Sequence, residues 1–502
     1  MLRTMVILLS PRQTRRYATR TRTFKDAIEC LNSLQTNFAT LEMLRNTPKR
    51  TANSAAIPEM IEWVRRIGYS PEDLDRMNVI HVTGTKGKGS TCAFTASILA
   101  QYKDEVPKVG LYTSPHLRSV RERIAINGEP ISERQFTQYF FDVWDRLEKS
   151  RSDETLFPTM GVGSRPVYFR FMTLLSFHVF LSEQVNAAVY EVGVGGEYDS
   201  TNVVPHPTAV GIARIGLDHT RVLGNTVAEI AWHKAGIMKH GTTAFSVEQP
   251  AKAWPVVQAR ATEPDKQVKL VSVGVDDYGL RHAELGLQGE FQAVNASLAV
   301  ALAREHLAKV GVQVGKDNDE AHGVRLLPKK FAAGLRDARW PGRCQTIVDG
   351  EVEWLIDGAH TADSIEAAAR WFRTRARPGS RKILVFNQQT RDGAELLRIL
   401  HGELVSGNVK FDAAVFTTNL TGRPDNDAGE LAALNTSEAD VQALVVQNRL
   451  ADAWREVHHD GDVEVTATIA DAVKYVRETA PVQVFAVGSL HLVGGLLVVL
   501  DK

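Results

Sequence analysis

The chain has 502 residues, of which 44% are hydrophobic and 24% charged, so we expect more than one domain and well-buried cores. Lysine plus arginine equals aspartate plus glutamate at 59 each, which argues against a globally basic nucleic-acid-binding protein but allows a local basic pocket. Three cysteines without a C-x-x-C pair indicate neither a disulfide framework nor a zinc site, and they fit a reducing compartment. No apolar run is long enough to predict an integral membrane segment.

The N-terminal segment, residues 1–23, differs from the rest in composition. It carries six arginines together with serine and threonine, and no acidic residue occurs before Asp26. This composition predicts a mitochondrial transit peptide, the alternative being a disordered basic tail. We therefore expect the protein in the mitochondrion, in the matrix with inner-membrane association left open, and in the cytoplasm.

Strands and helices alternate through residues 24–336. Helical periodicity dominates residues 24–77, and a short apolar strand at 79–82 then leads into a glycine-rich loop and a helix at 93–99. Further strands are expected at 109–112, 187–192, 209–215 and 244–247, with helices between them, for example at 169–183 and 227–238. This alternation predicts an α/β domain with a mostly parallel sheet, of the kind found in P-loop ATPases.

A second, smaller α/β domain is expected over residues 337–502. The turn-forming sequence Trp340-Pro341-Gly342-Arg343 follows a polar stretch, and the alternation then restarts. Strands are predicted at 353–356, 382–386, 413–417 and 483–487, with a helix at 364–373. The pattern is typical of a Rossmann-like fold, with residues 421–440 as a polar surface loop.

The glycine-rich loop runs Gly84-Thr85-Lys86-Gly87-Lys88-Gly89-Ser90 between the first strand and a helix. Glycines let backbone N–H groups surround phosphate oxygens, and the helix presents its positive N-terminus to the same anion. Lys88 is placed to reach the outer phosphates of ATP. Gly89 is an addition to the usual motif and displaces the hydroxyl that normally holds Mg²⁺. The alternative is a glycine-rich turn that binds nothing.

From the sequence alone, Glu191 is a candidate metal ligand and His219 is a weaker one. Glu191 ends a buried apolar strand, where a carboxylate needs a charged partner, a metal ion or a cap of backbone amides. His219 taken alone is more consistent with a structural role, because imidazole is not a typical Mg²⁺ ligand.

An ordered set of motifs along the chain resembles the folylpolyglutamate synthases, within the larger Mur ligase group, from about Phe24 to Gly495. The motifs are the glycine loop at 81–90, the N-terminal motif at 31–37, Thr113-Ser114-Pro115-His116-Leu117, Arg121-Glu122-Arg123-Ile124, Glu191-Val192-Gly193-Val194-Gly195-Gly196, Asp199-Ser200-Thr201-Asn202, Leu217-Asp218-His219-Thr220, Lys234-Ala235-Gly236-Ile237, Trp340-Pro341-Gly342-Arg343, Asp357-Gly358-Ala359-His360 and Gly488-Ser489-Leu490-His491. Each motif alone is weak, whereas the ordered set is specific.

The resemblance implies roles for individual residues. It implies Mg²⁺ ligation by Ser114, Glu191 and His219, with a monovalent cation such as K⁺ left open. It implies catalytic roles for Lys88, His219, Arg343 and Lys234, the last either carbamylated or simply ion-paired. The implied ATP contacts are Gly84, Thr85, Gly87, Lys88, Gly89, Ser90, Arg343 and Asp357. His360, Gln292 and Asn295 are weaker candidates.

The resemblance also implies the reaction. ATP would activate the γ-carboxylate of a reduced folate as an acyl phosphate, the amine of L-glutamate would attack it, and ADP and phosphate would leave. The segment at 165–171 resembles the pattern of the eukaryotic enzymes with this activity alone. The alternatives are a dihydrofolate synthase acting on dihydropteroate and a nucleotide- or folate-binding protein without ligase activity. No interface signature argues against a monomer.

Overall fold

The computed structural model describes residues 22–35, 55–280, 283–314, 320–321, 324–325, 327–389, 391–422, 430 and 441–501. Residues 1–21 of the expected transit peptide, positions 36–37 of the N-terminal motif and most of segment 421–440 lie outside the described residues. The first described residues contact the rest of the domain: Arg22 pairs with Asp145 at 2.8 Å, and Thr23 caps the first described helix. No helix within the described ranges is long and apolar enough to cross a membrane.

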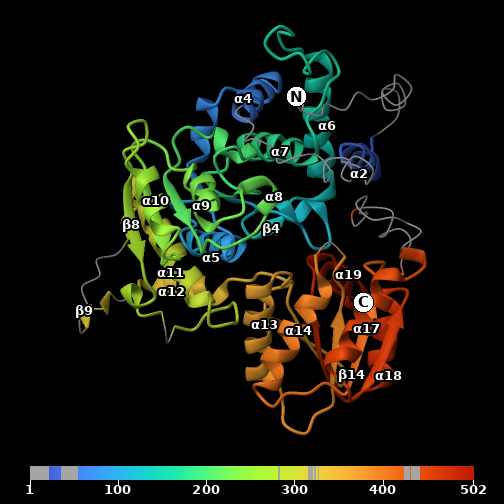
Figure 1. Cartoon of the computed structure of the whole chain (residues 1–502). Helices are drawn as coiled ribbons and strands as arrows, with labels where there is room; N and C mark the ends of the chain where they lie inside the picture. The colour runs from blue at the N-terminus through green and yellow to red at the C-terminus, as the bar shows by residue number, and fades with distance from the viewer. Residues whose placement is uncertain are drawn as a thin grey trace.

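Two α/β units lie one above the other in Figure 1, each built around its own sheet. The expected domain boundary at 337 falls between the sheets, at the end of helix α12. The larger sheet has the strand order β4-β3-β2-β5-β1-β6-β7-β8. Its strands are β1 (Val79–Thr83), β2 (Val109–Tyr112), β3 (Ile124–Ile126), β4 (Glu129–Pro130), β5 (Ala187–Glu191), β6 (Ala209–Ile212), β7 (Thr243–Val247) and β8 (Lys269–Val273).

The pairings of the larger sheet are parallel from β2 to β8, and only the β2–β3 and β3–β4 pairings at one edge are antiparallel. Helices cover both of its faces, so the central strands β1, β2, β5, β6 and β7 are buried at every position. Its helices and 3₁₀ turns are α2 (Phe24–Asn32), α4 (Ala56–Arg66), η1 (Glu72–Met77), α5 (Lys88–Leu99), η2 (Val120–Arg123), α6 (Glu133–Lys149), α7 (Tyr168–Ser182), η3 (Ser200–Val203), α8 (Thr220–Leu223), α9 (Val227–Ala235), α10 (Trp254–Ala261), η4 (Asp276–Tyr278), α11 (Gln292–Lys309) and α12 (Lys329–Asp337).

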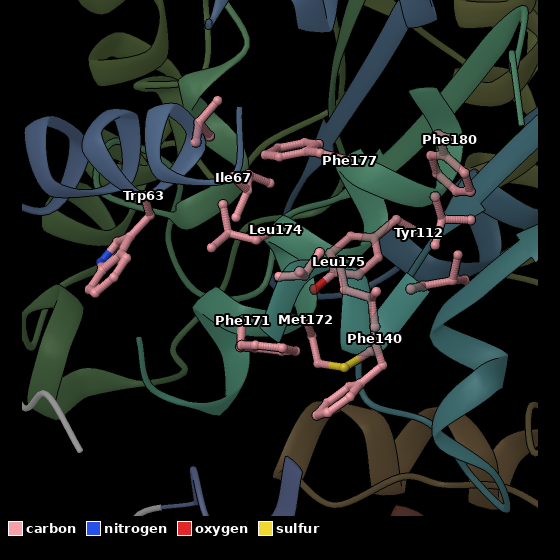
Figure 2. Packing of buried hydrophobic residues seen from close by; sticks show 14 of the residues in the cluster. Trp63, Ile67, Tyr112, Phe140, Phe171, Met172, Leu174, Leu175, Phe177 and Phe180 are labelled. Carbon is pink, nitrogen blue, oxygen red and sulfur yellow. The ribbon is translucent and has the colours of Figure 1, made fainter. Parts of the chain in front are cut away.

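Helix α7 is the centre of the core on one face of this sheet. Every side chain from Phe171 to Leu181 is buried, as expected for a helix that is apolar on all sides. Figure 2 shows Phe171 of α7 between Trp63 of α4 and Phe140 of α6, with Tyr112 of β2 near Leu175. On the opposite face, α5 packs against α11 and α12. The phosphate-loop helix α5 therefore has a rigid support.

The smaller sheet has the order β11-β12-β16-β13-β14-β15 and is parallel except for the edge strand β11. Ile383 and Val385 point to one helical layer, while Leu384 and Phe386 point to the other. Its strands are β11 (Gln345–Asp349), β12 (Val352–Ile356), β13 (Lys382–Phe386), β14 (Ala413–Thr417), β15 (Asp462–Thr466) and β16 (Val482–Val487). Its helices are α13 (Ala362–Arg375), α14 (Gly393–Val405), α17 (Val445–Val457), α18 (Ile469–Glu478) and α19 (Leu490–Leu500).

The expected fold class is confirmed, with differences in detail. The apolar runs of the sequence did not predict strands β3, β4, β8, β11 and β15. These strands are short or lie at sheet edges, and they bury only part of their side chains. The helix expected at 227–238 ends at Ala235, because Gly236 interrupts it. A pair of two-residue strands, β9 (Glu320–Ala321) and β10 (Val324–Arg325), lies in the polar stretch before Trp340.

Candidate active site

The glycine loop crosses from β1 to α5 at the carboxyl end of the central strand. Gly87 has φ 85° and precedes the first residue of α5, and an added Cβ there would collide with Asn295 Oδ1. Because L-residues rarely adopt this conformation, glycine is required at this position. The backbone N–H groups of Thr85 and Lys86 both donate to the Arg214 carbonyl, at 2.8 and 3.0 Å. The loop is therefore fixed to the segment that follows β6.

Two lysines converge on a single loop carbonyl. Lys88 Nζ donates to the Gly84 oxygen at 3.0 Å, and Lys234 Nζ donates to the same oxygen at 2.7 Å. Lys234 is 3% exposed, and burial together with the nearby Lys88 lowers its pKa well below the usual value for lysine. Lys88 lines the cavity described below, whereas Lys234 and Gly84 lie behind it. Lys234 therefore supports the loop from inside the domain.

The expected magnesium ligands Ser114 and Glu191 lie side by side at the ends of β2 and β5. Glu191 Oε2 accepts a hydrogen bond from the Ser114 backbone N–H at 3.0 Å. Burial raises the pKa of Glu191, while Lys88, the Ser114 amide and Arg343 act in the opposite direction. A buried carboxylate in this position is stabilised by a cation.

The third expected ligand, His219, lines the same cavity from the loop after β6. It has φ 49° and immediately precedes the short helix α8, and burial lowers its pKa, so the imidazole is neutral near pH 7. Within the described residues, no group of three or more histidine, cysteine, aspartate or glutamate side chains gathers as a metal cluster. The three expected ligands are thus a hydroxyl, a carboxylate and an imidazole, from Ser114, Glu191 and His219.

The second domain contributes Arg343, Asp357 and His360. Asp357 directly follows β12 and accepts from the backbone N–H groups of Cys344 and Ala359, both at 2.8 Å. Burial raises the pKa of Asp357 and lowers that of His360 to about 4. A Cβ on Gly358 would lie 2.5 Å from Arg343 Nη1, so the glycine leaves room for the guanidinium.

A cavity of about 880 Å³ lies where the carboxyl ends of the two sheets meet, and it is lined by residues of both domains. This is where ligands bind in open α/β folds. Among the expected residues, the lining includes Thr85, Gly87, Lys88, Gly89, Ser90, Ser114, Glu191, His219, Arg343, Asp357, His360 and Asn295. The fold thus brings ten of the implied site residues, from Thr85 to Asp357, to one cavity, together with the weaker candidates His360 and Asn295.

Gln292 is the one weaker candidate that does not line the cavity. It is fully buried, and its amide donates to Ser90 Oγ at 3.3 Å and accepts from Asn295 at 2.8 Å. Gln292 therefore anchors the start of α5 to α11. Gly89, the additional glycine of the loop, faces Trp340, since a Cβ there would lie 3.0 Å from the indole Nε1. The small residue thus lets the interdomain segment approach the phosphate loop.

Charged residues that motif reasoning left without a role also line the cavity. Asp218 bonds Arg391 of the second domain at 2.9 Å and lies 3.8 Å from Lys86 of the glycine loop. Burial acts to raise the pKa of Asp218, but His219, Arg391 and Lys86 outweigh it and hold the pKa below its usual range. Arg391 follows strand β13. Its place just beyond a parallel strand, where ligands bind in open α/β folds, is the sequence feature that could have identified it as a candidate site residue. Arg123 and Phe169 also line the cavity from η2 and α7.

Comparison with known proteins decides the family. The chain is 48% identical over 486 residues to the folylpolyglutamate synthase of Saccharomyces cerevisiae strain YJM789, covering 96% of this chain and 87% of the relative. This chain belongs to the folylpolyglutamate synthase family. A family model described as "Dihydrofolate synthetase, C-terminal domain" matches residues 342–499. The chain is therefore an ATP-dependent ligase of the C–N bond-forming class.

Solved folylpolyglutamate synthases share the fold. The Mycobacterium tuberculosis folylpolyglutamate synthase complexed with ADP superposes with a TM-score of 0.70 at 22% identity, covering 95% of this chain and 99% of that one. A solved FPGS–AMPPCP–folate complex superposes with a TM-score of 0.63 at 24% identity, covering 93% and 100% of the two chains. The two-domain architecture described above is thus that of the folylpolyglutamate synthases.

The Asp218–Arg391 pair is expected to couple the two domains of this folylpolyglutamate synthase relative. Asp218→Asn and Arg391→Gln should each lower kcat/KM about tenfold, and the double variant should lose little more than either, because both changes break the same contact. Steady-state kinetics on the four proteins measure this coupling. Arg398→Gln is the control, since Arg398 pairs at 3.8 Å with the exposed Glu456 on the outer surface. Fully additive losses would show that the pair does not act as a unit.

Proposed function

We propose that this protein joins L-glutamate to the γ-carboxylate of reduced folates, with ATP converted to ADP and phosphate. The observation that carries the proposal is the interdomain cavity, which holds the phosphate loop, the buried Glu191 and the second domain's Arg343 together. The 48% identity to the yeast folylpolyglutamate synthase supports the same activity. A carboxylate does not acylate an amine at neutral pH, so a phosphoryl donor is needed to create a leaving group.

The residues present suit that chemistry. Lys88 and the amides of the glycine loop bind the phosphates of ATP, and Arg343 offsets charge as the γ-phosphoryl group moves to the folate carboxylate. Glutamate's amine then attacks the acyl phosphate, the tetrahedral adduct collapses and phosphate leaves. The cavity lies between two domains, so their approach excludes water from the acyl phosphate, which would otherwise hydrolyse.

The donor set fits Mg²⁺. Glu191 offers a buried carboxylate and Ser114 lies next to it, and Mg²⁺ prefers oxygen ligands and is commonly held by one or two carboxylates together with substrate phosphates. Ser114 and Glu191 would hold the ion, with His219 at its side. Bound there, Mg²⁺ would neutralise negative charge on the phosphates. The hydroxyl of Ser90, displaced by Gly89, is directed towards Gln292 instead.

Lys234 supports the loop in either protonation state. A buried lysine whose pKa is lowered spends more time as the free amine, which is the form that reacts with carbon dioxide. Carbamylation of Lys234 therefore stays a proposal. The monomeric state and the mitochondrial and cytoplasmic location, which rests on the arginine-rich composition of residues 1–23, likewise stay predictions from the sequence.

The substrate test compares the two pterin acceptors. Purified protein is supplied with ATP, Mg²⁺ and glutamate, together with either tetrahydrofolate or dihydropteroate, and phosphate release is measured. We expect turnover that requires both tetrahydrofolate and glutamate. The match of residues 342–499 to the dihydrofolate synthetase model favours that activity as the second candidate. Glutamate-dependent turnover with dihydropteroate but not with tetrahydrofolate would establish it. ATP hydrolysis whose rate does not depend on glutamate or on either pterin would indicate a protein without ligase activity.

A further inference from the structure

Arg123 is a buried cation whose position the reaction outlined above does not explain. It ends the 3₁₀ turn η2, is 8% exposed and lines the cavity together with Ser114, Glu191 and Phe169. Its charge is close enough to act on Glu191, whose pKa it helps to lower against the effect of burial. Arg123 therefore lies near the reacting centre, on the side formed by η2 and α7.

Uncharged groups hold the guanidinium in place. Its Nε donates to His116 Nδ1 at 2.9 Å, and its Cζ lies 5.4 Å from the centre of the Tyr168 ring. The hydrogen bond holds the Nε edge of the guanidinium, and the ring contact covers one of its faces. They leave the terminal Nη1 and Nη2 groups available, and those two nitrogens carry four of the five N–H donors of an arginine.

A negatively charged partner for Arg123 is missing from the described part of the protein. No carboxylate there lies within 4.0 Å of its guanidinium, and neither Nη1 nor Nη2 makes a hydrogen bond to another described residue. By contrast, Lys86 and Arg391 share Asp218 in the same cavity. Burying an arginine without an anion is unfavourable, so the arrangement is suited to an anion that arrives with a ligand.

The neighbouring side chains indicate which anion this is. Lys88 on the glycine loop and Arg343 on the second domain are the cations placed for the phosphates. Arg123 instead stacks on the Tyr168 ring and shares the cavity wall with Phe169, an aromatic side chain against which a flat ring system bearing a carboxylate would fit. Arginine binds a carboxylate with two parallel N–H···O bonds, which also fixes its orientation.

We propose that Arg123 is a catalytic residue that binds the γ-carboxylate of the folate substrate and orients it for phosphoryl transfer. The inference rests on the proposed function. One carboxylate oxygen bonds to the γ-phosphorus while the bond from that phosphorus to the bridging oxygen breaks and its electron pair leaves with ADP. Arg123 keeps the other carboxyl oxygen, so the acyl carbon faces the incoming amine of glutamate. Phosphate then departs with the electron pair of the acyl–oxygen bond, and the amine's proton goes to solvent.

The test compares folate with its γ-amide, which keeps the ring system and the α-carboxylate but lacks the negative charge at the γ position. Binding of each is measured by calorimetry in the presence of Mg²⁺ and a non-hydrolysable ATP analogue. The wild type should prefer the acid by about 30-fold, the range of a hydrogen bond to a charged group. Arg123→Gln should abolish that preference and raise KM for folate, with KM for ATP unchanged. Arg123→Lys, which keeps the charge but not the paired donors, should retain part of the preference.

Arg121→Gln is the matched control. Arg121 lies two residues earlier in η2, donates to the Ile131 carbonyl at 3.1 Å and stacks on Phe24 outside the cavity, so its loss should leave the acid preference intact. Thermal unfolding of every variant checks that it is folded. An acid preference that survives in Arg123→Gln, or a change confined to KM for ATP or glutamate, would overturn the proposal. A wild type that binds neither folate compound would defeat the proposed function, and this inference with it.

Discussion

Replacing Glu191 by glutamine is expected to reduce ligation by at least about 100-fold while leaving the protein folded. The side chain is 5% exposed, accepts the Ser114 amide and faces the cavity near Lys88. Glutamine keeps its size and one hydrogen-bond acceptor but removes the negative charge that would hold Mg²⁺. Phosphate release measured over a range of Mg²⁺ concentrations should show both the lower rate and a weaker response to the metal.

Glu248→Gln is the control for this experiment. Glu248 also lines the cavity, but its side chain is exposed and belongs to the segment after β7. Its loss should change the rate by less than a few-fold, because an exposed carboxylate interacts weakly with its surroundings. Activity close to wild type in Glu191→Gln, at ordinary Mg²⁺ concentrations, would refute the role given to Glu191.

Lys88→Ala is expected to lower kcat by about 1000-fold, because the ammonium is the loop cation proposed to bind the γ-phosphate of ATP. In the structure Lys88 Nζ bonds the Gly84 carbonyl at 3.0 Å, so the side chain is already held over the loop. The Gly84 carbonyl keeps its bond from Lys234 when Lys88 is removed, and the loop should therefore stay in shape. Single-turnover phosphate release separates the chemical step from ATP binding.

Lys86→Ala serves as the comparison for Lys88. Lys86 is two residues away in the same loop and lines the same cavity, but it lies 3.8 Å from Asp218, and burial lowers its pKa to about 8. Its removal should cost about tenfold, through a weaker contact between the loop and Asp218. Equal losses in the two variants would show that Lys88 acts only through the general charge of the loop.

Local signals in the sequence account for much of the site. The order strand, glycine loop, helix predicted a phosphate-binding loop at residues 84–90, and the structure has β1, that loop and α5 in this order. Continuous apolar runs identified the central strands β2, β5, β13 and β14, because both faces of such strands are buried and nearly every residue must be apolar. Edge strands such as β8 and β15 carry no such signal.

The glycine loop, Glu191 and the family resemblance follow from the sequence by itself, because chain neighbours and residue types determine them. Only the tertiary structure brings Arg391 to Asp218, Trp340 to Gly89 and Arg123 to the wall of the cavity. Whether a charged side chain is buried, and whether it has a charged partner, depends on which strand ends and loops come together between the two sheets. An unpaired arginine and a salt-bridged one look alike in a sequence, and packing alone distinguishes them.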